Sequence, residues 1–206
     1  MISVNNILAV EQYLNNIDGV IFDLDDTLYS EKDYVKSGYK AIAEQFTEIN
    51  DAEKKLWMAF IKGEKAIDSV FLAEGMVEKK ADALQIYREH MPTIKLYEGV
   101  EKLLYRIKES GRKIGIITDG RPNGQRNKIA ALKIVVDEII ITDELGGIQY
   151  RKPNSTAFEL MRDRLQIDYD RMVYIGDNIV KDFIAPEKLG MNTIYFRNID
   201  GLYYKE

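Results

Sequence analysis

The stretch DGVIFDLDDTLYS, residues 18–30, decides the fold expected for this chain. It begins with the apolar run VIF, which is typical of a buried strand in a parallel sheet. The carboxylates of Asp23, Asp25 and Asp26 follow directly, and Thr27 comes next. Like charges at the end of a buried strand repel one another and are costly to remove from water. Such a cluster therefore indicates a chemical role.

From residue 93 onward, predicted strands and helices alternate. The pattern favours strands at residues 113–118, 138–142, 172–176 and 192–196, with amphipathic helices between them. This alternation predicts an α/β fold: a Rossmann-like parallel sheet with helices on both faces. A short amphipathic helix is expected ahead of the first strand, from Ile7 to Ile17, because its apolar residues recur at helical spacing.

Residues 31–92 show helical periodicity only. We therefore expect an all-helical insert there, and a core made of residues 1–30 and 93–206. Helix periodicity alone does not say which insert residues face a site. The candidates on the first helix are Lys32, Tyr34, Lys36 and Tyr39.

Composition excludes several classes of function. The 206 residues carry a net charge of −5 with acidic and basic residues interspersed, which argues against nucleic acid as a partner. The chain has no cysteine, so disulfides, thiolate metal sites and cysteine nucleophiles are excluded. Its single histidine, His90, is interpreted as a hinge or packing residue.

The N-terminus lacks a basic segment, and no stretch approaches the about 18 apolar residues of a membrane span. We expect a cytoplasmic protein that does not bind membranes, either a monomer or a homodimer. The N-terminal helix and the aromatic tail GLYYKE (201–206) are expected to pack on the core or to contribute to a dimer.

Polar groups follow the predicted strands at one edge of the sheet, where parallel sheets form their sites. Several carboxylates in one crevice are tolerated when they bind a hard divalent cation such as Mg²⁺. That cation and a lysine would offset the repulsion between an anionic nucleophile and a phosphate group. The groups gathered in this way are Asp23, Asp25, Thr118, Asp119, Lys152, Asp177 and Asp182.

The segments DLDDT (23–27), IITDG (116–120), YRKPN (150–154) and GDNIVKD (176–182) resemble, in order, the four motifs of the haloacid dehalogenase superfamily. DxDxT alone would be a weak match, but four motifs that each follow a predicted strand are a strong one. An insert placed after the first motif resembles the helical cap of the subfamily that includes phosphoglycolate phosphatase and the sialic-acid 9-phosphatases.

The resemblance implies roles for the motif residues. Asp23 would be the nucleophile that forms an aspartyl-phosphate, and Asp25 would protonate the leaving oxygen and then activate water. The phosphoryl group would be held in the second and third motifs, by Thr118, Asp119 and Lys152. The Mg²⁺ ligands would be Asp23, the backbone carbonyl of Asp25, Asp177 and, directly or through water, Asp182.

We therefore predict a Mg²⁺-dependent phosphatase of a small phosphorylated metabolite, of the sugar phosphate or nucleotide class. Halide needs no proton on leaving, so the acid at Asp25 favours a phosphatase over a dehalogenase. Its neighbours Asp23 and Asp177, together with a bound phosphate dianion, are expected to keep Asp25 protonated, although Mg²⁺ would act in the opposite direction. The alternatives are a phosphonatase or phosphomutase relative, and a non-catalytic phosphate-binding module.

Simpler interpretations stay open at several positions. Asp26 and Thr27 are also typical of turn caps, and Lys152 of an ordinary loop. Asp182 is also typical of the start of a helix. Arg121 is interpreted as an exposed loop residue, with a contact to substrate or phosphate as the alternative. Asp119 departs from the usual asparagine of the second motif, so its carboxylate must face away from the phosphate or weaken its binding.

Overall fold

The apolar run ahead of Asp23 forms strand β2 (Gly19–Phe22), which is buried along its whole length. In the computed structural model, which describes residues 1–204, β2 lies between β3 (Lys113–Thr118) and β5 (Met172–Gly176). The strand order is β1-β6-β5-β2-β3-β4 and all pairs are parallel, as predicted. The other strands are β1 (Ile2–Val4), β4 (Glu138–Ile141) and β6 (Asn192–Phe196).

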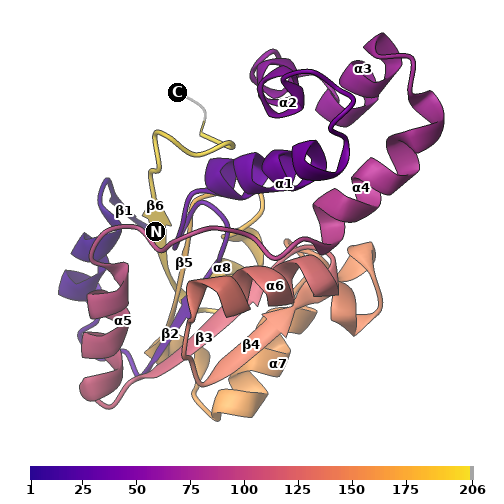
Figure 1. Ribbon diagram of the computed structural model, residues 1–206. Helices are drawn as coiled ribbons and strands as arrows, with labels where there is room; N and C mark the ends of the chain where they lie inside the picture. The colour runs from indigo at the N-terminus through magenta and orange to yellow at the C-terminus, as the bar shows by residue number, and fades with distance from the viewer. Residues whose placement is uncertain (205–206) are drawn as a thin grey trace.

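Both faces of the sheet are covered, because consecutive strand residues point to opposite sides. Val20 and Phe22 belong to an apolar cluster that also contains the buried residues of α5 (Val100–Glu109). Ile21 belongs to a second cluster, formed with the apolar face of α7 (Thr156–Leu165). The remaining helices around the sheet are α6 (Pro122–Leu132) and α8 (Ile184–Lys188), as Figure 1 shows. The predicted α/β architecture is therefore confirmed.

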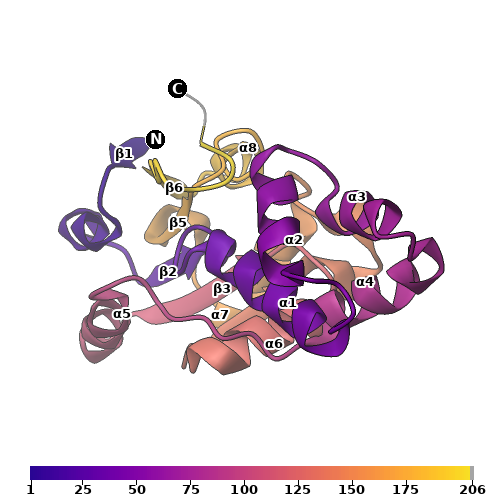
Figure 2. The ribbon, with the colours of Figure 1, turned by 45° about the horizontal axis from the view of Figure 1, so that its top comes forward.

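Four helices follow β2 and form a separate layer above the sheet (Figures 1 and 2). Between them they enclose an apolar cluster of their own, distinct from the two clusters that flank the sheet. Its fully buried members include Ile42, Leu56 and Phe71. The helices are α1 (Glu31–Gln45), α2 (Ala52–Ile61), α3 (Ala66–Ala73) and α4 (Lys80–Glu89).

The N-terminal segment differs from the prediction. The expected helix is the 3-10 helix η1 (Ile7–Tyr13), and strand β1 precedes it and pairs with β6. The apolar residues that suggested a helix are nevertheless buried. A strand of three residues is too short to show an alternating pattern, which is why the sequence did not indicate β1. Other short 3-10 turns are η2 (Val77–Lys79), η3 (Thr142–Leu145), η4 (Ile148–Tyr150) and η5 (Tyr169–Arg171).

The segment after β5 also differs. The alternating pattern predicts a helix between β5 and β6, but residues 179–183 form turns and α8 begins only at Ile184. The side chain of Asn178 accepts the backbone N–H of Val180 at 3.1 Å, which offers the backbone an alternative to a helical turn. Among residues 1–204, no helix combines the length and apolar character needed to cross a bilayer.

Candidate active site

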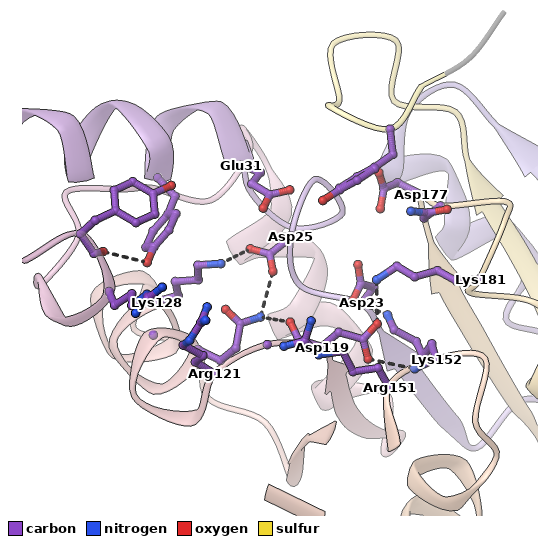
Figure 3. Close-up of a pocket in the computed structure, with 18 of the residues that line it drawn as sticks. Asp23, Asp25, Glu31, Asp119, Arg121, Lys128, Arg151, Lys152, Asp177 and Lys181 are labelled. Carbon is purple, nitrogen blue, oxygen red and sulfur yellow. Dashed lines mark hydrogen bonds and ion pairs between the residues drawn. The ribbon is translucent and has the colours of Figure 1, made fainter. Parts of the chain in front are cut away.

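The carboxyl ends of β2, β3 and β5 meet at a cavity of about 590 Å³ between the sheet and the four-helix layer. Five of the seven predicted site residues line it, and Figure 3 labels them all. The other two, Thr118 and Asp182, are fully buried and contact the lining residues Gln125 and Lys152. The lining residues among the seven are Asp23, Asp25, Asp119, Lys152 and Asp177.

Three carboxylates gather at one end of the cavity. Asp23, Asp177 and Asp182 each offer an oxygen within 4.8 Å of the others, and all three residues are buried. Burial, followed by the charges of Asp23 and Asp182, raises the pKa of Asp177 to about 9. Burial raises the pKa of Asp23 to about 6, although Lys152 opposes this rise. Buried carboxylate oxygens whose charges raise one another's pKa fit a hard divalent cation such as Mg²⁺.

The Lys152 ammonium is buried against this cluster. Its Nζ lies 2.6 Å from Asp23 Oδ1 and 2.8 Å from Asp182 Oδ1, and it donates to the hydroxyl of Tyr174 at 2.8 Å. Burial lowers the pKa of Lys152, but Asp182 and Asp23 more than offset this, so the lysine stays charged. Lys152 is therefore not an ordinary loop lysine: its cation is aimed at the carboxylate expected to act as the nucleophile.

Asp182 is fixed by the turn that replaces the expected helix. Its Oδ2 accepts the backbone N–H of Asn178 at 2.9 Å. The carboxylate packs on Gly176, where a Cβ would lie only 2.5 Å from Asp182 Oδ2. A side chain at position 176 would therefore displace this carboxylate from the cluster.

Asp25 points away from Asp23 and Asp177 and towards Lys128 of helix α6 (Figure 3). Its Oδ1 lies 2.7 Å from Lys128 Nζ and accepts the hydroxyl of Tyr29, while Oδ2 accepts Gln125 Nε2 at 2.8 Å. Burial raises the pKa of Asp25, but the Lys128 charge and these hydrogen bonds outweigh it, so the pKa lies below its ordinary value. Asp23 and Asp177 therefore do not by themselves keep Asp25 protonated, because the cation on α6 dominates. The expected contribution of a bound phosphate dianion stays a prediction.

Gln125, which donates to Asp25, also hydrogen-bonds two residues of the second motif. Gln125 Nε2 also donates to Thr118 Oγ1 and, at 3.0 Å, to the carbonyl of Asp119. The Asp119 carboxylate contacts Lys181 Nζ at 2.7 Å and accepts the Lys152 N–H at 3.0 Å. Burial raises the pKa of Asp119, but Lys152 and Lys181 outweigh burial and lower it. A cation thus balances the unusual carboxylate of this motif.

On the helical side, only one of the four candidates from α1 reaches the cavity. Tyr34 lines it, and Lys128 Nζ lies 4.1 Å from the centre of its ring. Lys36 and Tyr39 line a different hollow between α1 and α2, and Lys32 lines neither. His90 packs its ring against Tyr34 and hydrogen-bonds the carbonyl of Tyr87 at 2.8 Å, which confirms a packing role.

Sequence reasoning missed several lining residues. Gln125 and Lys128 are three positions apart on α6, so they share the helix face that follows the second motif; that spacing was the available signal. Lys181 stands inside the fourth motif itself. No sequence signal placed Glu31 or Tyr203 at the cavity. Of the tail 201–206, residues 205–206 lie outside the described residues.

Comparison with known proteins identifies related sequences. The family described as haloacid dehalogenase-like hydrolase matches residues 20–196. The glyceraldehyde 3-phosphate phosphatase of Methanocaldococcus jannaschii is 30% identical over 203 residues, covering 91% of this chain and 87% of that protein. The glyceraldehyde 3-phosphate phosphatase of Methanopyrus kandleri is 28% identical over 199 residues, covering 88% and 84%.

Solved structures share the fold. A subfamily IA hydrolase of the same superfamily from Geobacter sulfurreducens superimposes with a TM-score of 0.67 at 16% identity, covering 87% of each chain. A superfamily hydrolase from Bacillus subtilis, solved bound to magnesium, gives a TM-score of 0.62 at 19% identity, covering 87% of this chain and 86% of that one. At these identities the similarity extends to the fold alone.

Proposed function

The chain belongs to the haloacid dehalogenase-like hydrolase family, and on this premise we propose that it is a Mg²⁺-dependent phosphatase of small sugar phosphates. The observation that carries the proposal is the buried contact of Lys152 with Asp23 and Asp182, beside the third carboxylate of the cluster. The names of the curated relatives support a phosphorylated three-carbon sugar as the substrate.

In the first step, an Asp23 oxygen attacks phosphorus and the bond from phosphorus to the leaving alkoxide breaks. The alkoxide takes a proton from Asp25, so an alcohol leaves and an aspartyl-phosphate remains. Lys152 stabilises the negative charge that builds up on the phosphoryl oxygens. Thr118 and the second-motif backbone, including Asp119, hold the same group.

In the second step, water attacks phosphorus while Asp25 takes its proton, and the bond between phosphorus and Asp23 breaks. Lys128 holds Asp25 ionised before substrate binds, which is the form needed for this step. For the first step Asp25 must carry a proton. The arriving phosphoryl anion must therefore raise the pKa of Asp25 against the effect of Lys128.

The cluster of Asp23, Asp177 and Asp182 would hold the Mg²⁺, with the Asp25 backbone carbonyl as a further ligand. When bound, the ion supplies positive charge that offsets repulsion between a carboxylate and a phosphate. We also propose that residues 31–92 act as a cap over the core formed by 1–30 and 93–206. The separate apolar cluster of α1–α4 supports that division.

Phosphate release from a panel of phosphorylated sugars, nucleotides and p-nitrophenyl phosphate tests the proposal, with Mg²⁺ and with EDTA. We expect Mg²⁺-dependent release that falls more than about 10³-fold in Asp23→Asn, with thermal unfolding showing an intact fold. Release that survives both EDTA and the substitution would refute the chemistry. No release across the panel would favour a phosphate-binding module.

A further inference from the structure

One carboxyl group in the cavity has no partner of its own. Glu31 is the first residue of α1 and lines the cavity beside Asp25. Its Oε2 atom is buried, yet it makes no hydrogen bond to any of residues 1–204. Buried polar atoms are nearly always paired, so an unpaired one that faces a binding cavity indicates a group supplied by a ligand.

A second polar group comes from the C-terminal tail. Tyr203 lines the same cavity, although it lies far from Glu31 in sequence. The two side chains are close enough that the Glu31 charge is the largest cause raising the pKa of the Tyr203 phenol, ahead of burial. The start of α1 and residues 202–203 therefore meet at one part of the cavity wall.

A single buried residue of the first motif holds both segments in place. Asp26 Oδ1 accepts the backbone N–H of Glu31 at 2.8 Å, and Asp26 Oδ2 accepts that of Leu202 at 2.7 Å. The carbonyl of Asp26 accepts Asn198 Nδ2 at 2.7 Å. Asp26 is fully buried. Asp26 therefore fixes the backbone of Glu31 and of Leu202, the residue before Tyr203. This role is larger than that of the turn cap expected from sequence.

The surrounding charges limit what can bind here. The Asp25 carboxylate, whose pKa is lowered, acts on both Glu31 and the Tyr203 phenol, so a second anionic group of a substrate placed beside them would meet its negative charge. The Lys128 ammonium acts on Glu31 and opposes another cation. A neutral hydroxyl group can both donate and accept hydrogen bonds, and it pairs with a carboxyl and a phenol without either penalty.

We propose that Glu31 and Tyr203 form a subsite that binds a hydroxyl group of the leaving alcohol. The enzyme then prefers polyhydroxylated phosphate monoesters to plain alkyl phosphates of the same length. This inference rests on the proposed phosphatase activity and adds a specificity-determining pair to it. Asp26 acts as a positioning residue for that pair.

The test compares kcat/KM for glycerol 3-phosphate and propyl phosphate, which share a three-carbon chain and differ in two hydroxyl groups. We expect the wild-type enzyme to prefer glycerol 3-phosphate. Tyr203→Phe removes only the phenolic hydroxyl and should reduce the preference about five- to tenfold, mainly through KM. Glu31→Leu should reduce it by at least as much.

Matched controls lie nearby. Tyr204→Phe alters a tyrosine that lines a different hollow, and Glu44→Gln alters an exposed residue of α1 outside the cavity. Both should keep the wild-type preference ratio. The readout is the ratio of the two kcat/KM values within one variant. A loss of folded enzyme lowers both values equally, so it leaves the ratio unchanged.

The outcomes separate this inference from the activity on which it rests. Mg²⁺-dependent hydrolysis of both substrates with an equal kcat/KM, or an unchanged ratio in Tyr203→Phe, would overturn the subsite and leave the phosphatase standing. A higher kcat/KM for phosphoethanolamine than for glycerol 3-phosphate would mean that the subsite binds an ammonium group, which would overturn the hydroxyl subsite. Wild-type enzyme that hydrolyses none of these substrates, nor p-nitrophenyl phosphate, would overturn both.

Discussion

The two ends of the cavity are held in different ways. Near Asp23, most polar groups come directly after a strand, and the others pack against those groups. The register of the parallel sheet therefore fixes the position of the whole cluster. Near Glu31, the groups come from α1 and the C-terminal tail, and hydrogen bonds from their backbone N–H groups to the Asp26 side chain hold them. We infer that the first end sets the reaction and the second sets the leaving group.

Removing the cation of the first end should have the largest effect. Lys152→Met leaves Asp23 and Asp182 without their buried partner, so kcat should fall about 10²- to 10³-fold for every substrate. The loss should not depend on the leaving group, because Lys152 acts on the phosphoryl group. Steady-state kinetics with alkyl and p-nitrophenyl esters measure this. A loss confined to alkyl esters would contradict the division between the two ends.

A smaller loss of activity is expected when Lys128, which lies between the two ends of the cavity, is substituted. Lys128→Met removes the 2.7 Å contact that orients the Asp25 carboxyl group, so proton delivery to the leaving oxygen should be impaired even though the pKa of Asp25 rises. We therefore expect kcat/KM for alkyl phosphates to fall about 10- to 100-fold. The loss should be much smaller for p-nitrophenyl phosphate, whose leaving group needs little protonation. Lys36→Met is the matched control, since Lys36 contacts Trp57 on a separate hollow. Equal losses for both ester types would rule out a role through Asp25.

The smallest effect concerns stability at the second end. Burial, with help from Asp25, raises the pKa of Glu31 from 4.5 to about 8. Between these values the unfolded chain has lost this proton while the folded chain keeps it, so the free energy of unfolding falls as pH rises. Glu31→Gln removes this dependence.

Denaturant unfolding of both proteins from about pH 5 to about pH 8 checks this. The stability of Glu31→Gln relative to wild type should increase across the range. Glu44→Gln, on the exposed side of the same helix, should show no such trend. A difference that stays constant with pH would mean that Glu31 ionises normally in the folded protein.

The difference between the two ends also explains what could be predicted from sequence. Residues at strand ends were predictable, because a buried apolar run followed by a polar residue fixes both the strand and the edge where the side chain emerges. Asp23, Thr118 and Asp177 lie where this rule places them. Asp182 reached the same cluster although its backbone is a turn rather than a helix.

The rest depends on long-range packing. The contact of Lys128 with Asp25 joins residues far apart in the chain, and it reverses the expected direction of the Asp25 pKa shift. Helix periodicity correctly put Lys36 and Tyr39 on the same helix as Tyr34. It could not determine how that helix is rotated relative to the sheet, and so which of its residues face the cavity. The position of Tyr203 follows from the hydrogen bond between Asp26 and the tail, which no local pattern encodes.

Chemical trapping of the covalent intermediate tests the central claim most directly. Wild-type enzyme would be quenched during turnover of p-nitrophenyl phosphate with Mg²⁺ and treated with borohydride, which reduces an acyl phosphate to an alcohol. Mass spectrometry of the peptides should then find homoserine in place of Asp23, and only in samples that received substrate. Reduction at another carboxylate, or at none while phosphate is being released, would contradict Asp23 as the nucleophile.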